Sequence, residues 1–361
     1  MRLAVDAKPL VFARRAFQRA LPPATREWLG SAVRKNTYTL VQDADSGSAF
    51  AVVGDDRPVE HFARVYLEAS SYRSARHLIL GDHVRQIVSL LRRYGLVIFS
   101  GVETPPALSA DIIRMPRFVS LSVDLMESED ALYRSLHESA RYDVRKARNF
   151  QMDVHRDVDW VGEFFDRYHS KSMLMRHGSE GFIQSPQELR ELIETQNCEF
   201  VCVSENGTRL AAVLAQPESD VYVMGRIGWR DGDQSLLKRR VLGALYWFSF
   251  VRARQLGYRT VSYGGTPPYL EDGLFQFKAR WNAKMEAKKR DFGNYDLLID
   301  PAHAVAARYQ QSHSLIHFKE PGRLMVSATT CDAWEGLPER IRAGLSGWAP
   351  APEPVCLRQS E

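Results

Sequence analysis

The segment Gly273-Leu274-Phe275-Gln276-Phe277-Lys278-Ala279-Arg280-Trp281-Asn282 carries the strongest functional signal in this chain of 361 residues. It sets one lysine and one arginine among three aromatic side chains. Aromatic packing limits where a long cationic side chain can swing, so such a segment can hold positive charge beside an anionic carrier or a developing oxyanion. We therefore predict a ligand site here.

The elements that lead into this segment predict an α/β fold. An apolar helix is expected over 236–256, where Gly257 ends it, and a short strand over 260–263 runs into Gly264-Gly265. A similar helix, stop glycine and strand occur over 88–101, and the two stop glycines are 257 − 95 = 162 residues apart. Either the chain repeats one α/β unit, or the likeness is chance, because helix–glycine–strand series are common in α/β proteins.

Other patterns fill in the expected secondary structure. Strands are expected over 38–41, 49–53, 96–99, 118–125, 200–204, 210–216, 221–228 and 284–292, and helices over 83–94, from 128 onward, and over 159–172, 186–196 and 300–313. The sequence after Val326 is loop-like in composition. At this length the chain suits two domains of ordinary size.

Composition and cysteine usage narrow the class of protein. A net charge of +4 fits an anionic partner, and it fits a solvated basic surface equally well. No run of eighteen apolar residues occurs, so no membrane span is expected. Cys198 and Cys202 have no second Cys or His pair near them in the sequence, so we expect buried thiols, no metal site and a cytoplasmic location.

Two motifs resemble those of one family. The order helix, strand, Gly-Gly and then Gly-Leu-Phe-x-Phe-Lys-x-x-Trp resembles the C-terminal half of Fem-type and related GNAT-fold acyltransferases, although Trp281 stands where that family usually has Phe. Arg141 to Ala147, with Arg-x-x-x-Arg-Lys-Ala, resembles a second signature of these enzymes. The resemblance implies two GNAT-like halves in tandem, each a mixed sheet flanked by helices, with the first half reduced. The expected divisions are a reduced half over 1–115, an acyltransferase half over 116–300, a helical extension over 301–349 and a disordered tail over 350–361.

The resemblance also implies catalytic residues. Lys278 matches the family's Phe-Lys lysine, which implies contact with the donor or with the oxyanion. Glu271 and Asp272 precede Gly273 and are candidates to orient or deprotonate an amine, or they form an ordinary acidic loop. His177 is a candidate general base, although a lone histidine in a loop is more often a surface residue.

Donor and acceptor contacts are expected on either side of these residues. The expected donor-binding residues are Lys238, Arg239, Arg240, Arg280 and Trp281, and the expected substrate-binding residues are Arg141, Arg145, Arg176, Tyr263 and Gly264. Lys238, Arg239 and Arg240 open the helix expected over 236–256, and the N-terminus of a helix offers N–H groups to phosphate. The turn Arg240-Val241-Leu242-Gly243-Ala244-Leu245, however, departs at Leu245 from the pyrophosphate turn of coenzyme A enzymes.

These observations predict an acyltransferase that forms an amide. The favoured donor is aminoacyl-tRNA, as in Fem-type enzymes, and the acceptor is a small-molecule or cell-wall-precursor amine. One alternative is an N-acyltransferase that uses acyl-CoA or an acyl carrier, and another is a non-catalytic scaffold that binds a metabolite or RNA. No tightly bound cofactor is expected, only a co-substrate, and nothing in the sequence predicts an oligomeric state.

Overall fold

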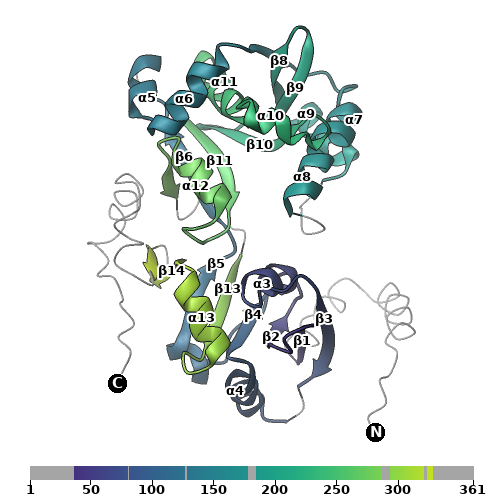
Figure 1. Ribbon diagram of the computed structural model, residues 1–361, viewed down its shortest axis with the longest axis vertical. Helices are drawn as coiled ribbons and strands as arrows, with labels where there is room; N and C mark the ends of the chain where they lie inside the picture. The colour runs from purple at the N-terminus through teal and green to yellow at the C-terminus, as the bar shows by residue number, and fades with distance from the viewer. Residues whose placement is uncertain are drawn as a thin grey trace. The chain divides into compact units, whose positions relative to one another are not determined.

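The computed structural model describes residues 36–79, 81–126, 128–177, 184–286, 293–320 and 323–327. The chain forms two compact units (Figure 1): Met1–Arg114 with Asn294–Gln310, and Met115–Gly293 with Gln311–Glu361. The tail expected over 350–361 lies outside the described residues, as do residues 287–292 of one expected strand. Within the described residues, no helix has both the length and the apolar character needed to cross a bilayer.

The first unit is built on a six-stranded sheet of order β3-β1-β2-β4-β13-β5. Its strands are β1 (Thr37–Asp43), β2 (Ala49–Gly54), β3 (Tyr72–Leu78), β4 (Leu96–Ser100), β5 (Ile112–Pro116) and β13 (Asn294–Ile299). Its helices are α3 (Val59–Val65), α4 (His83–Tyr94), the 3-10 turn η1 (Pro106–Asp111) and α13 (Ala304–Ser312).

The return of the chain to this sheet differs from the expected division at residue 300. Strand β13 pairs antiparallel with β4, from Tyr295 opposite Ser100 to Ile299 opposite Leu96, so the chain rejoins the first unit after residue 293. The extension expected over 301–349 begins with helix α13, but a hairpin follows it, formed by β14 (Leu315–Glu320) and β15 (Arg323–Ser327).

The second unit is built on a seven-stranded sheet of order β12-β6-β11-β10-β9-β8-β7. Its strands are β6 (Val119–Asp124), β7 (Gln151–His155), β8 (Glu199–Glu205), β9 (Thr208–Pro217), β10 (Val221–Trp229), β11 (Thr260–Thr266) and β12 (Lys284–Glu286). Its helices are α5 (Glu129–Ser135), α6 (Glu138–Ala147), α7 (Val161–Glu163), the π-helix η2 (Phe164–His169), α8 (Ser170–His177), α9 (Pro186–Gln196), η4 (Arg230–Gly232), α10 (Gln234–Lys238), α11 (Val241–Gln255) and α12 (Gly273–Ala279).

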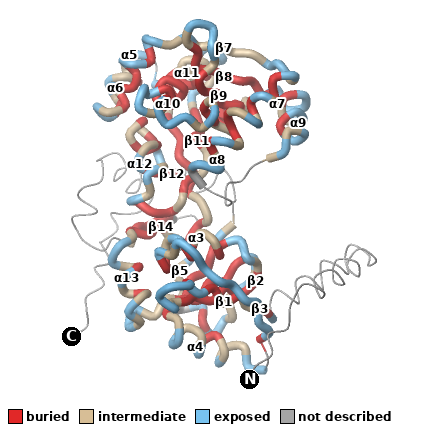
Figure 2. Tube along the Cα trace, turned by 45° about the vertical axis from the view of Figure 1, so that its right-hand side comes forward, coloured by how far each residue is buried: buried red, intermediate tan, exposed pale blue. Residues whose placement is uncertain are grey.

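Alternation along the central strands packs both faces of this sheet. On β8, Val201 and Val203 lie in a large apolar cluster with side chains of α6 and α11, whereas Phe200 and Cys202 lie in another with side chains of η2 and α9. Successive side chains of a strand point to opposite faces. The sheet is therefore covered on both sides, and Figure 2 shows the buried residues concentrated along β8, β9 and α11.

The long helix expected over 236–256 is two helices. Arg240 has a φ of 69° and lies between α10 and α11, so the regular helix stops there and restarts at Val241. The apolar periodicity continues across this break, which is why the pattern alone predicts one helix. The break gives α11 an N-terminus of its own, with no side-chain cap.

The two units share part of their connectivity, as the internal likeness in the sequence suggested. In the first, the hairpin β1-β2 leads through α3, the edge strand β3 and α4 to β4, which pairs parallel with β2. In the second, the hairpin β9-β10 leads through α11 to β11, which pairs parallel with β10. An antiparallel strand follows in each sheet, β13 and β6. The predicted α/β class, with mixed sheets and flanking helices in two halves, is confirmed.

A buried ion pair fixes β8 to α11 and provides a test of the core. Glu199 is 1% exposed, and it accepts two 2.8 Å hydrogen bonds from Arg252 and one of 3.0 Å from the Tyr222 hydroxyl. Burial alone raises the pKa of this carboxyl, but the hydrogen bonds and charge of Arg252 outweigh it, and the pKa lies below its ordinary value of 4.5. The ionised carboxylate therefore stabilises the fold above its ordinary pKa, and this contribution is lost as the pH falls through the lowered pKa.

Glu199→Gln is expected to lower the free energy of unfolding at pH 7 by about 1.5–3 kcal/mol, the usual range for a hydrogen bond to a charged group. The difference from the unmodified chain should shrink at a pH below the lowered pKa. Urea denaturation at both pH values measures it. The matched control is Glu205→Gln, because Glu205 pairs with Arg239 at the surface. If Glu205→Gln lowered the free energy of unfolding as much as Glu199→Gln, the stabilising role of the buried Glu199–Arg252 pair would be contradicted.

Candidate functional site

Two parallel strands at the centre of the second sheet separate before either strand ends. β10 and β11 pair only through Val221–Val223 and Thr260–Ser262, although β10 continues to Trp229 and β11 to Thr266. Where neighbouring strands part, the backbone N–H and C=O groups on their facing edges lose a strand partner and can bond to a ligand. This separation is the first component of the candidate site.

Glycines accompany the separation on both strands. The register of β10 shifts around Gly225, and that of β11 shifts ahead of Gly265. Gly264 has a φ of 73°, which a residue with a side chain adopts only at a cost. A Cβ atom at Gly225 would lie 2.9 Å from the carbonyl oxygen of Leu214. Glycine is therefore required for the irregular backbone at Gly225 and Gly264.

The corresponding strands of the first unit remain closed. β2 and β4 pair through four residues, up to Gly54 opposite Ser100, where both strands end. Beyond that point the Asp55 carboxylate accepts a 2.7 Å hydrogen bond from the Ser100 hydroxyl, and Arg57 binds the same carboxylate. Side chains of the first unit thus bond to one another at the position where the strands of the second unit separate, which makes the second unit the candidate for substrate binding.

Lys278 lies beside the strand separation, in the interior of the second unit. It is 4% exposed, and its Nζ donates a 2.7 Å hydrogen bond to the carbonyl oxygen of Gly265. A buried amine is stable only when it is hydrogen-bonded or paired. Lys278 therefore fixes the backbone of β11 where β10 and β11 separate, which associates the predicted catalytic lysine with Gly264 and Gly265.

The two predicted acids have structural partners. Asp272 caps helix α12, because its Oδ1 accepts 2.9 Å hydrogen bonds from the N–H groups of Leu274 and Phe275. Both carboxylate oxygens of Glu271 lie 3.0 Å from the N–H of Ser314. These contacts account for both acids without an amine substrate, and they hold α12 and the chain before β14 in place.

The aromatic residues of the quoted segment form one buried cluster with α11 and β11. Trp281 is fully buried, its ring stacks on Tyr246 with centroids 5.6 Å apart, and its carbonyl accepts a 3.0 Å hydrogen bond from Tyr263. Burial raises the pKa of Tyr263 far above its ordinary value. Trp281 and Tyr263, predicted to touch donor and acceptor, thus belong to the supporting core, whereas Arg280 lies over the Phe277 ring at 4.3 Å.

An acid that the sequence did not single out organises the basic residues. Asp143, on α6, is 1% exposed, and it binds Arg280 through Oδ2, while Nε of Arg240 lies 3.7 Å from Oδ1. Its side chain lies against the first turn of α11, where a Cβ atom at Gly243 would be 2.5 Å from it. Burial raises the pKa of Asp143 despite both guanidinium groups, and burial lowers the pKa of Arg280.

This acid occupies the place where a phosphate was expected. The N-terminus of a helix favours a negative charge, and here the charge is supplied by Asp143 of the same chain. An aspartate inside a basic helix, together with a glycine inside the apolar pattern of α11, is the signal that could have revealed it. Arg240 and Arg280, both predicted to bind the donor, share Asp143 as a partner.

A cationic surface surrounds the exposed ring of Tyr142 next to this ion pair. Arg145, Lys146 and Arg240 have their charged groups 5.7, 5.5 and 5.6 Å from the ring centroid. Arg145 also donates a 3.1 Å hydrogen bond to the hydroxyl of Tyr133. We call Tyr142, Arg145, Lys146 and Arg240 the α6 cationic cluster. It joins one predicted donor residue to one predicted substrate residue.

The remaining predicted residues make other contacts or lie outside the described residues. Arg239 pairs with Glu205 at 2.6 Å, and Lys238 and Arg141 make no contact that links them to Asp143 in the described part of the chain. Arg176 and His177 end helix α8, but their side chains lie outside the described residues. For those two residues the assigned roles stay predictions.

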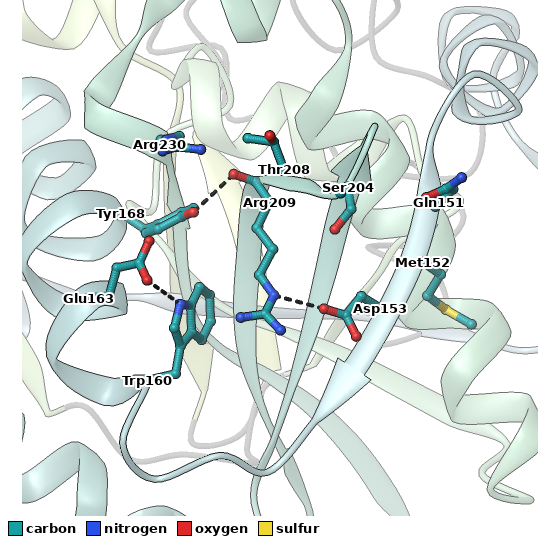
Figure 3. A pocket seen from close by; sticks show the side chains of 11 residues that line it. Gln151, Met152, Asp153, Trp160, Glu163, Tyr168, Ser204, Thr208, Arg209 and Arg230 are labelled. Carbon is teal, nitrogen blue, oxygen red and sulfur yellow. Dashed lines mark hydrogen bonds and ion pairs between the residues drawn. The ribbon is translucent and has the colours of Figure 1, made fainter.

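A separate cavity of about 530 Å³ lies at the other end of the second sheet (Figure 3). Its lining residues are Gln151, Met152, Asp153, Trp160, Glu163, Tyr168, Ser204, Gly207, Thr208, Arg209 and Arg230. Arg209 crosses it, bonded to Asp153 at 2.7 Å and stacked over Trp160 at 4.8 Å. No residue that the sequence predicted for a site lines this cavity.

Comparison with known proteins yields distant structural similarity. No family model and no curated protein matches the chain. Among solved structures, the chain is similar to one titled FemX, at 12% identity with a TM-score of 0.41 over 72% of this chain and 83% of that one. It is also similar to L-PGS from Bacillus licheniformis (16%, 0.37, 75% and 83%) and to a GCN5-related N-acetyltransferase from Kribbella flavida (11%, 0.31, 85% and 72%). Likenesses at this level assign no activity.

Proposed function

We propose that the protein is an acyltransferase that moves an aminoacyl group from aminoacyl-tRNA to an amine, as the resemblance of its motifs to Fem-type enzymes implies. The single observation that favours this donor over coenzyme A is the position of Asp143. Its carboxylate lies against the first turn of α11, bound to Arg280, where a pyrophosphate would otherwise be held. A second anion at that turn would meet like charge, which is unfavourable at close range.

The α6 cationic cluster provides a contact surface for a larger anion. Three cations close to one exposed tyrosine ring suit a nucleic acid, because the phosphates pair with the cations and an unpaired base can stack on the ring. A compact pyrophosphate needs fixed N–H donors, whereas a tRNA end can use mobile surface side chains. The cluster therefore supports a tRNA partner.

The reaction proceeds at the separation of β10 and β11 in this proposal. The acceptor amine attacks the ester carbonyl of the aminoacyl group and forms the new C–N bond. Backbone N–H groups on the separated strand edges stabilise the oxyanion of the tetrahedral intermediate. The C–O bond to the terminal ribose then breaks, and the departing ribose oxygen takes up the proton lost by the amine and becomes a hydroxyl. No covalent enzyme intermediate and no tightly bound cofactor are required.

The proposal is tested by an acyl-transfer assay with the full chain. The chain is incubated with aminoacylated tRNA or with acetyl-CoA and a panel of amines that includes a peptidoglycan precursor, an amino sugar and a polyamine. Mass spectrometry is expected to detect an amide product heavier by one aminoacyl residue only with tRNA. Transfer from acetyl-CoA alone would replace the proposal with the N-acyltransferase alternative, and tRNA binding without any transfer would favour the scaffold.

Binding measurements test the cationic cluster directly. The double variant Arg145→Ala, Lys146→Ala should weaken tRNA binding and reduce the slope of log Kd against log salt by about 1 for each phosphate that the variant no longer neutralises. Arg85→Ala is the control, because Arg85 is a highly exposed arginine of the first unit. Equal effects of both changes would contradict the assignment of the cluster.

A further inference from the structure

Three metal-binding side chains converge at the edge of the second sheet, away from the proposed transfer site. Asp153 and His155 are on β7, Cys202 is on β8, and the strands pair so that Asp153 lies opposite Cys202. Residues two apart on a strand face the same way, which brings His155 to the same side. One ligand atom from each residue lies within 4.8 Å of the other two.

The spacing of these atoms suits a shared tetrahedral ion. Nε2 of His155 lies 3.7 Å from Sγ of Cys202. Zinc bonds of about 2.3 Å to sulfur and about 2.0–2.1 Å to nitrogen, at a tetrahedral angle, place those two ligand atoms about 3.6 Å apart. The metal-free arrangement thus needs little movement to accept an ion.

We propose that Asp153, His155 and Cys202 bind a zinc ion. A thiolate and an imidazole select zinc over the calcium and magnesium ions that prefer all-oxygen sites. Three protein ligands leave one tetrahedral position for water or for a ligand. The proposal concerns a different part of the sheet from the transfer site and does not depend on the transferase activity.

Arg209 orients the carboxylate ligand, whereas the histidine changes one contact. Arg209 donates from Nε to Oδ2 of Asp153, which leaves Oδ1 for the metal, and its guanidinium is held over the ring of Trp160. Hydrogen-bonded carboxylates of this kind are common around metal sites. The N–H of Asp157 lies 3.3 Å from Nδ1 of His155. Zinc at Nε2 requires the ring proton on Nδ1, so this long contact is given up when the ion binds.

The cavity of Figure 3 gives the site a route to solvent. Asp153 lines it beside Arg209, so an ion that enters the cavity reaches the carboxylate end of the cluster without crossing the apolar core. Cys202 lies deeper, fully buried among the apolar residues packed around Phe164 and Phe200.

The test is a measurement of zinc affinity. The full chain is first freed of metal with a chelator, and its zinc affinity is then measured by competition with a chromophoric chelator. Cys202→Ser should abolish the binding of one zinc equivalent, or lower the zinc affinity by more than the 10–100-fold that is typical of losing an outer-shell partner. Cys198→Ser is the matched control, because Cys198 is also a buried thiol of the same apolar cluster and is not part of the ligand set. It should leave zinc binding unchanged.

Cobalt(II) provides an independent readout, because a cobalt–thiolate bond produces a charge-transfer absorption band. The band should be present in the unmodified chain and in Cys198→Ser, and absent in Cys202→Ser. If Cys202→Ser does not fold, Asp153→Asn, at a partly exposed residue, should weaken zinc in the same way. Failure of the unmodified chain to bind zinc, or equal binding by Cys202→Ser, would overturn the proposal.

Discussion

Asp143→Leu is expected to lower the free energy of unfolding by about 3–5 kcal/mol, the usual cost of removing one partner from a buried ion pair. Leucine keeps the branched end of aspartate, but its two methyl groups are bulkier than the carboxylate oxygens that lie against Gly243, so tighter packing adds to the loss of charge pairing. Arg280 would then keep a largely buried guanidinium without its carboxylate. The pKa of Arg280 is already lowered by burial, which indicates that its charge is costly there without a partner.

The double variant distinguishes charge pairing from packing. Arg280→Met alone should also destabilise, because it leaves the Asp143 carboxylate buried, with Arg240 as the more distant cation. Asp143→Leu combined with Arg280→Met should cost less than either single change, because a matched apolar pair often replaces a buried ion pair at little cost. Urea denaturation of the four proteins gives the coupling energy.

A surface pair serves as the control for this cycle. Asp231 and Arg167 are bonded as closely as many buried pairs, at 2.6 Å, but both side chains are more than 40% exposed. Asp231→Asn should change stability by no more than about 1 kcal/mol. Additive losses in the Asp143–Arg280 cycle would show that the two residues act separately, and the description of Asp143 as the centre of the basic residues would then be wrong.

The sequence predicted those elements whose residue pattern reports burial directly. Strands β8, β9 and β10 are nearly continuous apolar runs, and the turn Asn206-Gly207 marks the hairpin that joins the first two. Strand β3 was missed because all seven of its residues are exposed, so no alternation distinguishes it from a loop (Figure 2). Hairpin β14-β15 ends at Ser327, where the loop-like region was expected to begin, and its two strands were not predicted.

Long-range pairing explains the other differences. The position of β13 beside β4 depends on two segments almost two hundred residues apart, and nothing in either segment identifies the other. The division of the chain was therefore placed at residue 300, whereas the segment that follows residue 293 already belongs to the first unit.

The candidate site was predicted best where one short segment contains the signal. The segment from Gly273 to Trp281 did contain a buried lysine and an arginine beside aromatic rings. Asp143 was missed because its role depends on partners from α11 and α12. The same reason applies to Asp153, His155 and Cys202, whose ligand atoms meet only when β7 and β8 pair. Sequence motifs find ligands that are close along the chain, and these are not.

Lys278→Met is expected to reduce kcat/KM for aminoacyl transfer about 100-fold, the effect of a small misplacement of reacting groups. Methionine fills a similar volume but donates no hydrogen bond, so the carbonyl of Gly265 loses the bond that fixes β11 where it leaves β10. The free energy of unfolding should also fall by about 1–3 kcal/mol, the cost of leaving a buried polar group unsatisfied.

The division of the effect between kcat and KM identifies Lys278 as a positioning residue. If Lys278 holds the strand edge that carries the oxyanion donors, kcat should fall while the KM for aminoacyl-tRNA stays within about threefold, because the tRNA is bound elsewhere, by the α6 cationic cluster. Lys284→Met is the matched control, since Lys284 pairs with Asp124 at the exposed start of β12. A Lys278→Met protein that is less stable but turns over normally below its unfolding temperature would reduce Lys278 to a residue of the core. It would also remove the link between the quoted segment and catalysis, because the aromatic side chains of that segment and Arg280 are already accounted for by ring packing and by the pairing of Arg280 with Asp143.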